Sequence, residues 1–120
     1  MSDFVEFLEE VFAEFGPITT RRMFGAHGIY HDGLMFGLLA QGRLYLKTDA
    51  TNLPAFEAVN AQPFTFEQRG KPVKLSYWTA PESILDDRVQ AAAWAHSAFA
   101  AAMRAQEAKE RHAAPPWRQQ

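Results

Sequence analysis

The chain is expected to be an α+β domain, with a five-stranded antiparallel sheet and helices packed on one of its faces. Three observations predict this class. Strand-like segments are grouped together instead of alternating with helices, which favours an antiparallel sheet. Glycine-containing turns separate these segments at hairpin spacing, and helical patterns stand before, between and after the strand groups. The expected order is α-β-β-β-α-β-β-α.

The first helix is expected over Asp3–Phe15. Asp3 and Glu6 have the spacing of a capping box, and Gly16-Pro17 ends the helix because proline cannot continue it. The apolar residues of this segment fall at helical spacing and form one stripe for the core. They are Phe4, Leu8, Val11, Phe12 and Phe15.

A three-stranded meander is expected in Thr20–Thr48. Asp32-Gly33 is the strongest hairpin signal in the chain, because a type I′ turn needs positive φ at both central residues. A second tight turn is expected at Gln41-Gly42. The candidate strand segments are Ile18–Phe24, Gly28–His31, Leu34–Ala40 and Arg43–Lys47.

The second half predicts a short helix, a second hairpin and a long helix. The short helix spans Asn52–Val59, with Thr51 or Asn52 as its cap. The hairpin pairs Phe64–Glu67 with Val73–Trp78. Asp86 or Asp87 is then expected to cap a helix that runs to about Glu110.

The long helix carries two apolar stripes. One is assigned to the core and contains Val89, Ala93, His96, Ala100 and Met103. The other consists mostly of small residues: Ala91, Trp94, Ala95, Ala98, Ala102 and Ala105. A helix with two apolar faces is buried on both sides or used for association. Trp94, Ala98 and Ala102 are therefore the expected surface for a homodimer or a protein partner.

Length and composition bound the remaining possibilities. A chain of 120 residues fits a single domain, here 1–112, with residues 113–120 as a flexible tail. The absence of cysteine excludes disulfides and thiolate metal sites. The acidic start does not resemble a secretory signal, and the longest apolar tract is too short to span a bilayer. We expect a cytoplasmic protein with no membrane partner.

Charge is unevenly distributed along a chain whose net charge is −2. Residues 3–14 hold five acids and no base, whereas residues 21–74 hold seven bases and four acids. A basic face on the sheet is therefore an open alternative, although the net charge argues against bulk coating of nucleic acid. The candidate ligand- or partner-binding residues are Arg21, Arg22, Arg43, Lys47 and Lys74.

Adjacent arginines in a strand point to opposite faces, so Arg21 and Arg22 are not expected to grip one ligand together. One of them is expected to face solvent while the other pairs with an acid of the first helix. The alternative is that at least one binds a partner or an anion. Aromatic residues such as Tyr45, which stands between Arg43 and Lys47, fit either a covered sheet face or a stacking platform.

Metal and catalytic motifs are absent from the sequence. His27, His31 and His96 lack the spacing of a zinc site, so no metal or cofactor is expected. No serine stands in a nucleophile-elbow context, and Asp86-Asp87 is interpreted as a helix cap. No enzymatic activity is expected.

Several segments together resemble the TfoX N-terminal domain family. They are Arg21-Arg22-Met23-Phe24-Gly25, Gly28-Ile29-Tyr30, Asp32-Gly33-Leu34-Met35-Phe36, Leu44-Tyr45-Leu46-Lys47-Thr48-Asp49, Pro63-Phe64, Gly70-Lys71-Pro72-Val73 and Tyr77-Trp78. The resemblance runs from about Ile18 to Met103 and implies an α+β sheet domain. The family is named for regulators of natural competence for DNA uptake, which act with transcription factors. It therefore implies a regulatory domain that works through protein contacts, with nucleic-acid or small-anion binding by the basic residues as the alternative.

Overall fold

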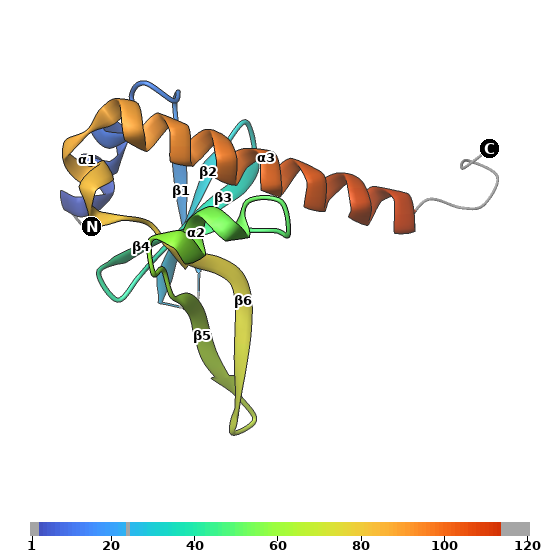
Figure 1. Cartoon of the computed structure of the whole chain (residues 1–120). Coiled ribbons are helices and arrows are strands. Elements are labelled where there is room, and N and C mark those ends of the chain that lie inside the picture. Colours follow the sequence, from blue (N-terminus) through green and yellow to red (C-terminus); the bar gives the residue numbers. More distant parts are fainter. Residues whose placement is uncertain (1–2, 24, 114–120) are drawn as a thin grey trace.

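The structure is a computed structural model that describes residues 3–23 and 25–113. It is an α+β fold with an antiparallel six-stranded sheet and three α-helices, as Figure 1 shows. The order of strands across the sheet is β1-β2-β3-β4-β6-β5. The strands are β1 (Thr19–Met23), β2 (Ala26–His31), β3 (Leu34–Ala40), β4 (Arg43–Lys47), β5 (Pro63–Gln68) and β6 (Lys71–Thr79).

The predicted class and antiparallel pairing are confirmed, but the sheet has six strands where five were expected. Each of the four segments assigned to the meander forms a strand of its own, because tight turns separate all of them. At the predicted turns, φ is 50° and 77° for Asp32 and Gly33, and 54° and 76° for Gln41 and Gly42. These positive values are those that a two-residue hairpin requires.

The helices begin and end within a few residues of the expected positions. Helix α1 (Asp3–Val11) ends earlier than predicted, and turns carry the chain on to Gly16. Asp87 accepts a hydrogen bond from the Gln90 amide at 3.0 Å and so caps α3 (Arg88–Ala113). Helix α2 (Leu53–Ala58) and a 3₁₀ turn, η1 (Glu82–Asp86), complete the elements. The Asp3 side chain of the expected capping box, Phe24 and residues 114–120 of the expected tail lie outside the described residues.

The main core lies between the helices and one face of the sheet, here called the covered face. Phe36 and Leu46 of the sheet and Phe12 of the α1 turn are fully buried there. Helices α1, α2 and α3 and the turn η1 all contribute residues to this cluster. In Figure 1, α3 crosses the sheet on this side while the β5–β6 hairpin projects away from it.

The prediction assigned the wrong stripe of α3 to the core. Val89 and Met103 of the expected core stripe are 74% and 46% exposed, and His96 is exposed as well. The small-residue stripe faces the sheet instead, because alanine lets the helix backbone approach the strands closely. Its fully or almost fully buried members are Ala91, Ala95, Ala98 and Ala102.

Candidate interaction surface

The sheet face turned away from the main core carries a second, smaller apolar cluster. Its buried members are Leu38, Ala40 and Tyr45, and in the described part of the chain the partly buried hydrophobic side chains packed against them also come from the sheet. Those neighbours are Ala26, Met35, Phe64 and Tyr77. Tyr30 belongs to the same side because it pairs directly with Met35. We call the surface formed by these eight residues the open face.

Side chains within the sheet close over the centre of the open face. Tyr45 is only 8% exposed, and its ring lies 5.1 Å from that of Phe64, which reaches it across β6. A Cβ placed on Gly28 would lie 2.9 Å from the Met23 Cε atom and 3.1 Å from both the Met35 sulfur and the Tyr30 ring. A side chain at position 28 would displace the end of the Met23 side chain, so glycine leaves room for these three side chains to converge.

Two cations lie over tyrosine rings of the open face. The Arg21 guanidinium carbon is 5.6 Å from the Tyr30 ring centroid, and Lys47 Nζ is 5.1 Å from that of Tyr77. Lys47 also donates a hydrogen bond of 2.6 Å to the Ser76 hydroxyl. Burial raises the pKa of Tyr77 to about 12, with a further contribution from Tyr30, and burial lowers the pKa of Lys47. Both side chains are partly desolvated, which strengthens their electrostatic interactions.

The structure brings three of the five predicted basic residues to the open face. Arg43 pairs with Ala40 and joins Arg21 and Lys47 there. The other two lie elsewhere: Arg22 pairs with His27 on the opposite side, and Lys74 pairs with Thr65 in the projecting hairpin. The divergence of Arg21 and Arg22 agrees with the sequence prediction. One of the two arginines was expected to pair with an acid of α1. Glu10 of α1 instead pairs with Arg88, at 3.5 Å.

The charge of the first four strands has one sign. Strands β1 to β4 contain Arg21, Arg22, Arg43 and Lys47 and no acidic residue. Asp32 lies in the turn between β2 and β3, and Asp49 follows β4. The open face therefore combines an apolar centre with a positively charged edge.

The expected association surface on α3 is corrected by the packing of that helix. Ala98 is fully buried and Ala102 is 3% exposed, both in the core shared with the sheet. Trp94 is half-buried, and its ring packs edge-on against Phe56 of α2 at 4.9 Å. Ala98 and Ala102 therefore stabilise the domain from within, whereas Trp94 keeps part of its surface accessible.

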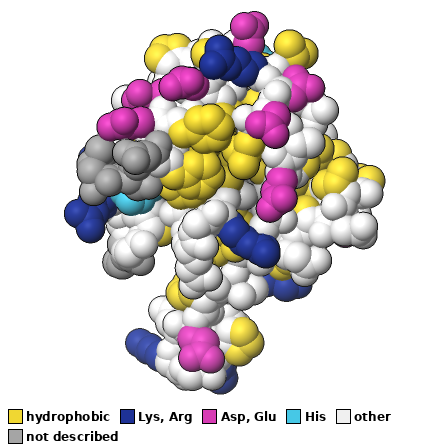
Figure 2. Space-filling view, turned by 90° about the vertical axis from the view of Figure 1, so that its left-hand side faces the viewer, with side chains coloured by type: hydrophobic (Ala, Val, Ile, Leu, Met, Phe, Trp, Pro, Cys, Tyr) yellow, Lys and Arg dark blue, Asp and Glu magenta, His cyan; other side chains and the backbone are white. Residues whose placement is uncertain are grey.

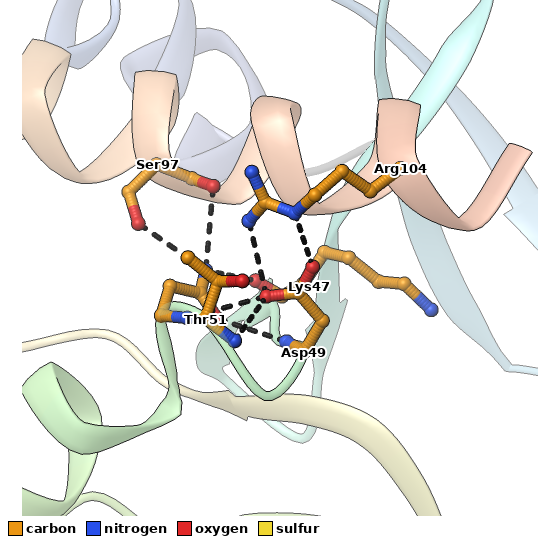
Figure 3. A network of polar contacts seen from close by, with 6 residues as sticks. Lys47, Asp49, Thr51, Ser97 and Arg104 are labelled. Carbon is orange, nitrogen blue, oxygen red and sulfur yellow. Dashed lines mark hydrogen bonds and ion pairs between the residues drawn. The ribbon is translucent and has the colours of Figure 1, made fainter. Parts of the chain in front are cut away.

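A polar network at the end of β4 fixes the sheet to α2 and α3, as Figure 3 shows. Asp49 accepts hydrogen bonds from Arg104 Nε at 2.6 Å and from its terminal NH₂ at 3.0 Å. The hydrogen bond from Arg104 is the main cause that lowers the pKa of Asp49. Asp49 and Asn52 also exchange side-chain to backbone hydrogen bonds of 2.8 and 3.2 Å. This network places the end of β4, including Lys47, relative to α3.

Asn52 does not cap α2 with its side chain as expected, because that side chain turns inward. Its amide donates to the Lys47 carbonyl at 3.1 Å and to the Ser97 carbonyl and hydroxyl at 3.3 and 3.2 Å. Asn52 is 8% exposed, so these bonds satisfy a buried polar group. The turn before α2 is held by Asp49 instead, which also accepts from the Thr51 amide at 3.0 Å.

Comparison with known proteins decides the family. The TfoX N-terminal domain matches residues 10–102, which is most of the chain. The chain belongs to the TfoX N-terminal domain family. No curated protein matches it.

The family match covers the open face and Asp49, whereas Arg104 of the network lies just beyond the matched residues. The five basic candidates of the sequence analysis include the three cations of the open face, and Tyr45 was noted between Arg43 and Lys47. Sequence reasoning had missed the contact between Asp49 and Arg104, which are 55 positions apart. No local pattern marks that pair, since each residue taken alone is an ordinary turn or helix residue.

Two histidines of this TfoX N-terminal domain, His31 and His96, contact the ring of Phe15. His31 lies 4.5 Å from the ring of Phe15 and 2.7 Å, through Nδ1, from the Pro17 carbonyl oxygen. His96 contacts the same Phe15 ring at 5.0 Å. Among the described residues, no cluster of three or more His, Asp or Glu side chains could hold a metal ion. Within the same part of the chain, no helix is long and apolar enough to cross a membrane.

A cleft of about 180 Å³ lies where α1, β4 and η1 meet. Leu44, Ala80, Pro81 and Leu85 give it an apolar lining, and Arg43 and Glu82 also line it. On this side of the molecule, Figure 2 shows hydrophobic side chains at the centre with acidic ones around them. Pockets for cofactor-sized ligands usually exceed about 300 Å³, so this cleft suits a single side chain.

Proposed function

We propose that this TfoX N-terminal domain is a non-catalytic cytoplasmic regulatory domain that acts in transcription through contact between its open face and a protein partner. The observation that carries the proposal is the composition of the open face. Its apolar centre is flanked by Arg21, Arg43 and Lys47, and its buried cluster contains only sheet residues. Protein interfaces have this anatomy, with an apolar centre inside a polar rim. Family membership supports a role in competence-type regulation.

Nucleic-acid or small-anion binding is the second candidate. The absence of acids from β1–β4 favours it. Two further facts favour the protein partner. The chain has a net charge of −2, and two of the three cations at the open face already lie over tyrosine rings.

The test compares two double charge reversals in the native host. Arg21→Glu with Arg43→Glu changes the open face, and Arg22→Glu with Lys74→Glu makes the same change of charge elsewhere. All four side chains are exposed, so both variants should fold. Transcripts that change when the gene is deleted should be restored by the wild type and by the second variant, but not by the first.

Two results contradict the proposal. One is that deletion changes no transcripts. The other is that the two variants restore transcription equally, because then the open face would have no special role. Circular dichroism of each purified variant establishes that the fold is retained.

A further inference from the structure

We propose that the partner segment bound by the open face is acidic and amphipathic, with apolar side chains at its centre and carboxylates beside Arg21, Arg43 and Lys47. The inference rests on the proposed function and adds the chemistry of the partner. It is carried by the charge pattern of the sheet and by the packing of the centre of the open face.

Charge complementarity selects an acidic partner. Strands β1–β4 supply cations and no acids, so a neutral or basic segment would leave these charges unmatched. A second copy meeting this one open face to open face would bring like charges together, which opposes association. Lys47 adds to the argument because burial lowers its pKa, and the nearby Asp49 raises that pKa only in part. A nearby carboxylate would offset that cost of desolvation.

The centre of the open face favours a protein segment over nucleic acid. Leu38, Ala40 and Tyr45 are 4%, 5% and 8% exposed, so the Tyr45 ring is covered and not free to stack on a base. The Tyr30 and Tyr77 rings have Arg21 and Lys47 over them, where a stacked base would have to lie. Three cations also neutralise few phosphates, and affinity for nucleic acid rises with the number neutralised.

The geometry favours apolar side chains spaced between acids. Met35, Tyr77 and Phe64 are half-buried and surround the fully packed centre, so added apolar groups would cover surface that is still in contact with water. Covering that surface supplies affinity, and the cations at the edge supply selectivity for acids. In an extended segment every second residue faces the same side, so a segment whose facing residues are apolar at the centre and acidic toward both ends presents both groups to the open face.

The test measures binding of short labelled peptides by fluorescence anisotropy. In the first probe, every second residue is leucine or phenylalanine at the centre and glutamate toward both ends, with serine at the positions between. A second probe replaces every glutamate with glutamine, and a third is single-stranded oligothymidylate. The glutamate peptide should bind, and the glutamine peptide should bind about tenfold more weakly. The Arg21→Glu/Arg43→Glu variant should lose a similar factor, while Arg22→Glu/Lys74→Glu should stay within about twofold of wild type.

Amide chemical shifts give a second readout that does not depend on the variants. Addition of the glutamate peptide should move the resonances of Tyr45 and Tyr77 and leave those of Trp94 and Phe56 in place. Shifts confined to Trp94 and Phe56 would place the binding surface elsewhere and overturn the inference.

The remaining outcomes separate this inference from the proposed function. Tighter binding of the oligonucleotide, or equal binding of both peptides, overturns the acidic partner. If the glutamate peptide fails to bind while transcription still depends on the open face, only the partner chemistry is wrong. If transcription is also independent of that face, the proposed function fails with it.

Discussion

The two faces of the sheet are made by neighbouring residues of the same strands but are stabilised in different ways. On the covered face, Phe36 meets the rings of Phe12 and Phe15 at 5.7 and 5.1 Å and is completely buried. On the open face, its neighbour Met35 packs only against other sheet residues and is half-buried. The covered face is therefore completed by the chain's own helices, whereas the open face retains accessible apolar surface beside its cations.

The largest effect that tests this comparison is on stability. Phe36→Ala should lower the free energy of unfolding by about 3–5 kcal/mol, because it leaves a cavity between the helices and the sheet. Met35→Ala should cost about 1 kcal/mol, since the site is already open to water. Urea denaturation followed by circular dichroism measures both. Equal losses at the two positions would mean that the open face is packed as tightly as the covered face.

The polar network extends the comparison to the end of the sheet, where it fixes β4 to the helices. Arg104→Gln should lower the free energy of unfolding by about 0.5–1 kcal/mol at neutral pH, because Arg104 and Asp49 are 42% and 25% exposed and the solvent screens them. The folded-state pKa of Asp49 is lowered. Its contribution is therefore complete above the unfolded pKa of about 3.9 and is lost as pH falls through the lower folded value.

Urea denaturation at a series of pH values measures this loss as a shrinking difference between wild type and Arg104→Gln in acid. The matched control is Arg88→Gln. Arg88 lies in α3, as Arg104 does, and this substitution removes a single contact of 3.5 Å to Glu10. That contact is exposed on both sides, so its removal should change stability very little. A difference for Arg104→Gln that stays constant down to acidic pH would show that Asp49 is not its source.

The sequence predicted the open face better than it predicted the covered face. Strand alternation separates Arg21 from Arg22, and a local turn such as Asp32-Gly33 sets the register without help from distant residues. The face of α3 could not be chosen in the same way. Alanine is only weakly hydrophobic. Hydrophobicity alone therefore does not favour the stripe containing Ala98 over the one containing Met103 as the side of α3 that faces the core. The choice depends on how closely the helix backbone can approach the sheet.

The number of strands depends on local turns, whereas the contact of Asp49 with Arg104 depends on the packing of distant parts of the chain. The sequence predicts every strand segment. It predicts a three-stranded meander, however, where tight turns divide the chain into four strands. The contact of Asp49 with Arg104 joins the end of β4 to a helix far along the chain. Only the packed arrangement of sheet and helix brings these residues together, and no sequence pattern predicts their contact.

The smallest effect concerns the two adjacent arginines, which differ only in the face they occupy. Arg21 lies over the Tyr30 ring, so a double-mutant cycle of Arg21→Gln with Tyr30→Leu should give a coupling energy of about 0.5 kcal/mol. The same cycle with Arg22→Gln should give a value near zero, because Arg22 pairs with His27 on the other side of the strand. Urea denaturation of the single and double variants measures both cycles. Equal coupling for the two arginines would mean that Tyr30 senses net charge alone, and the open face would then lose its distinct arrangement of cations over rings.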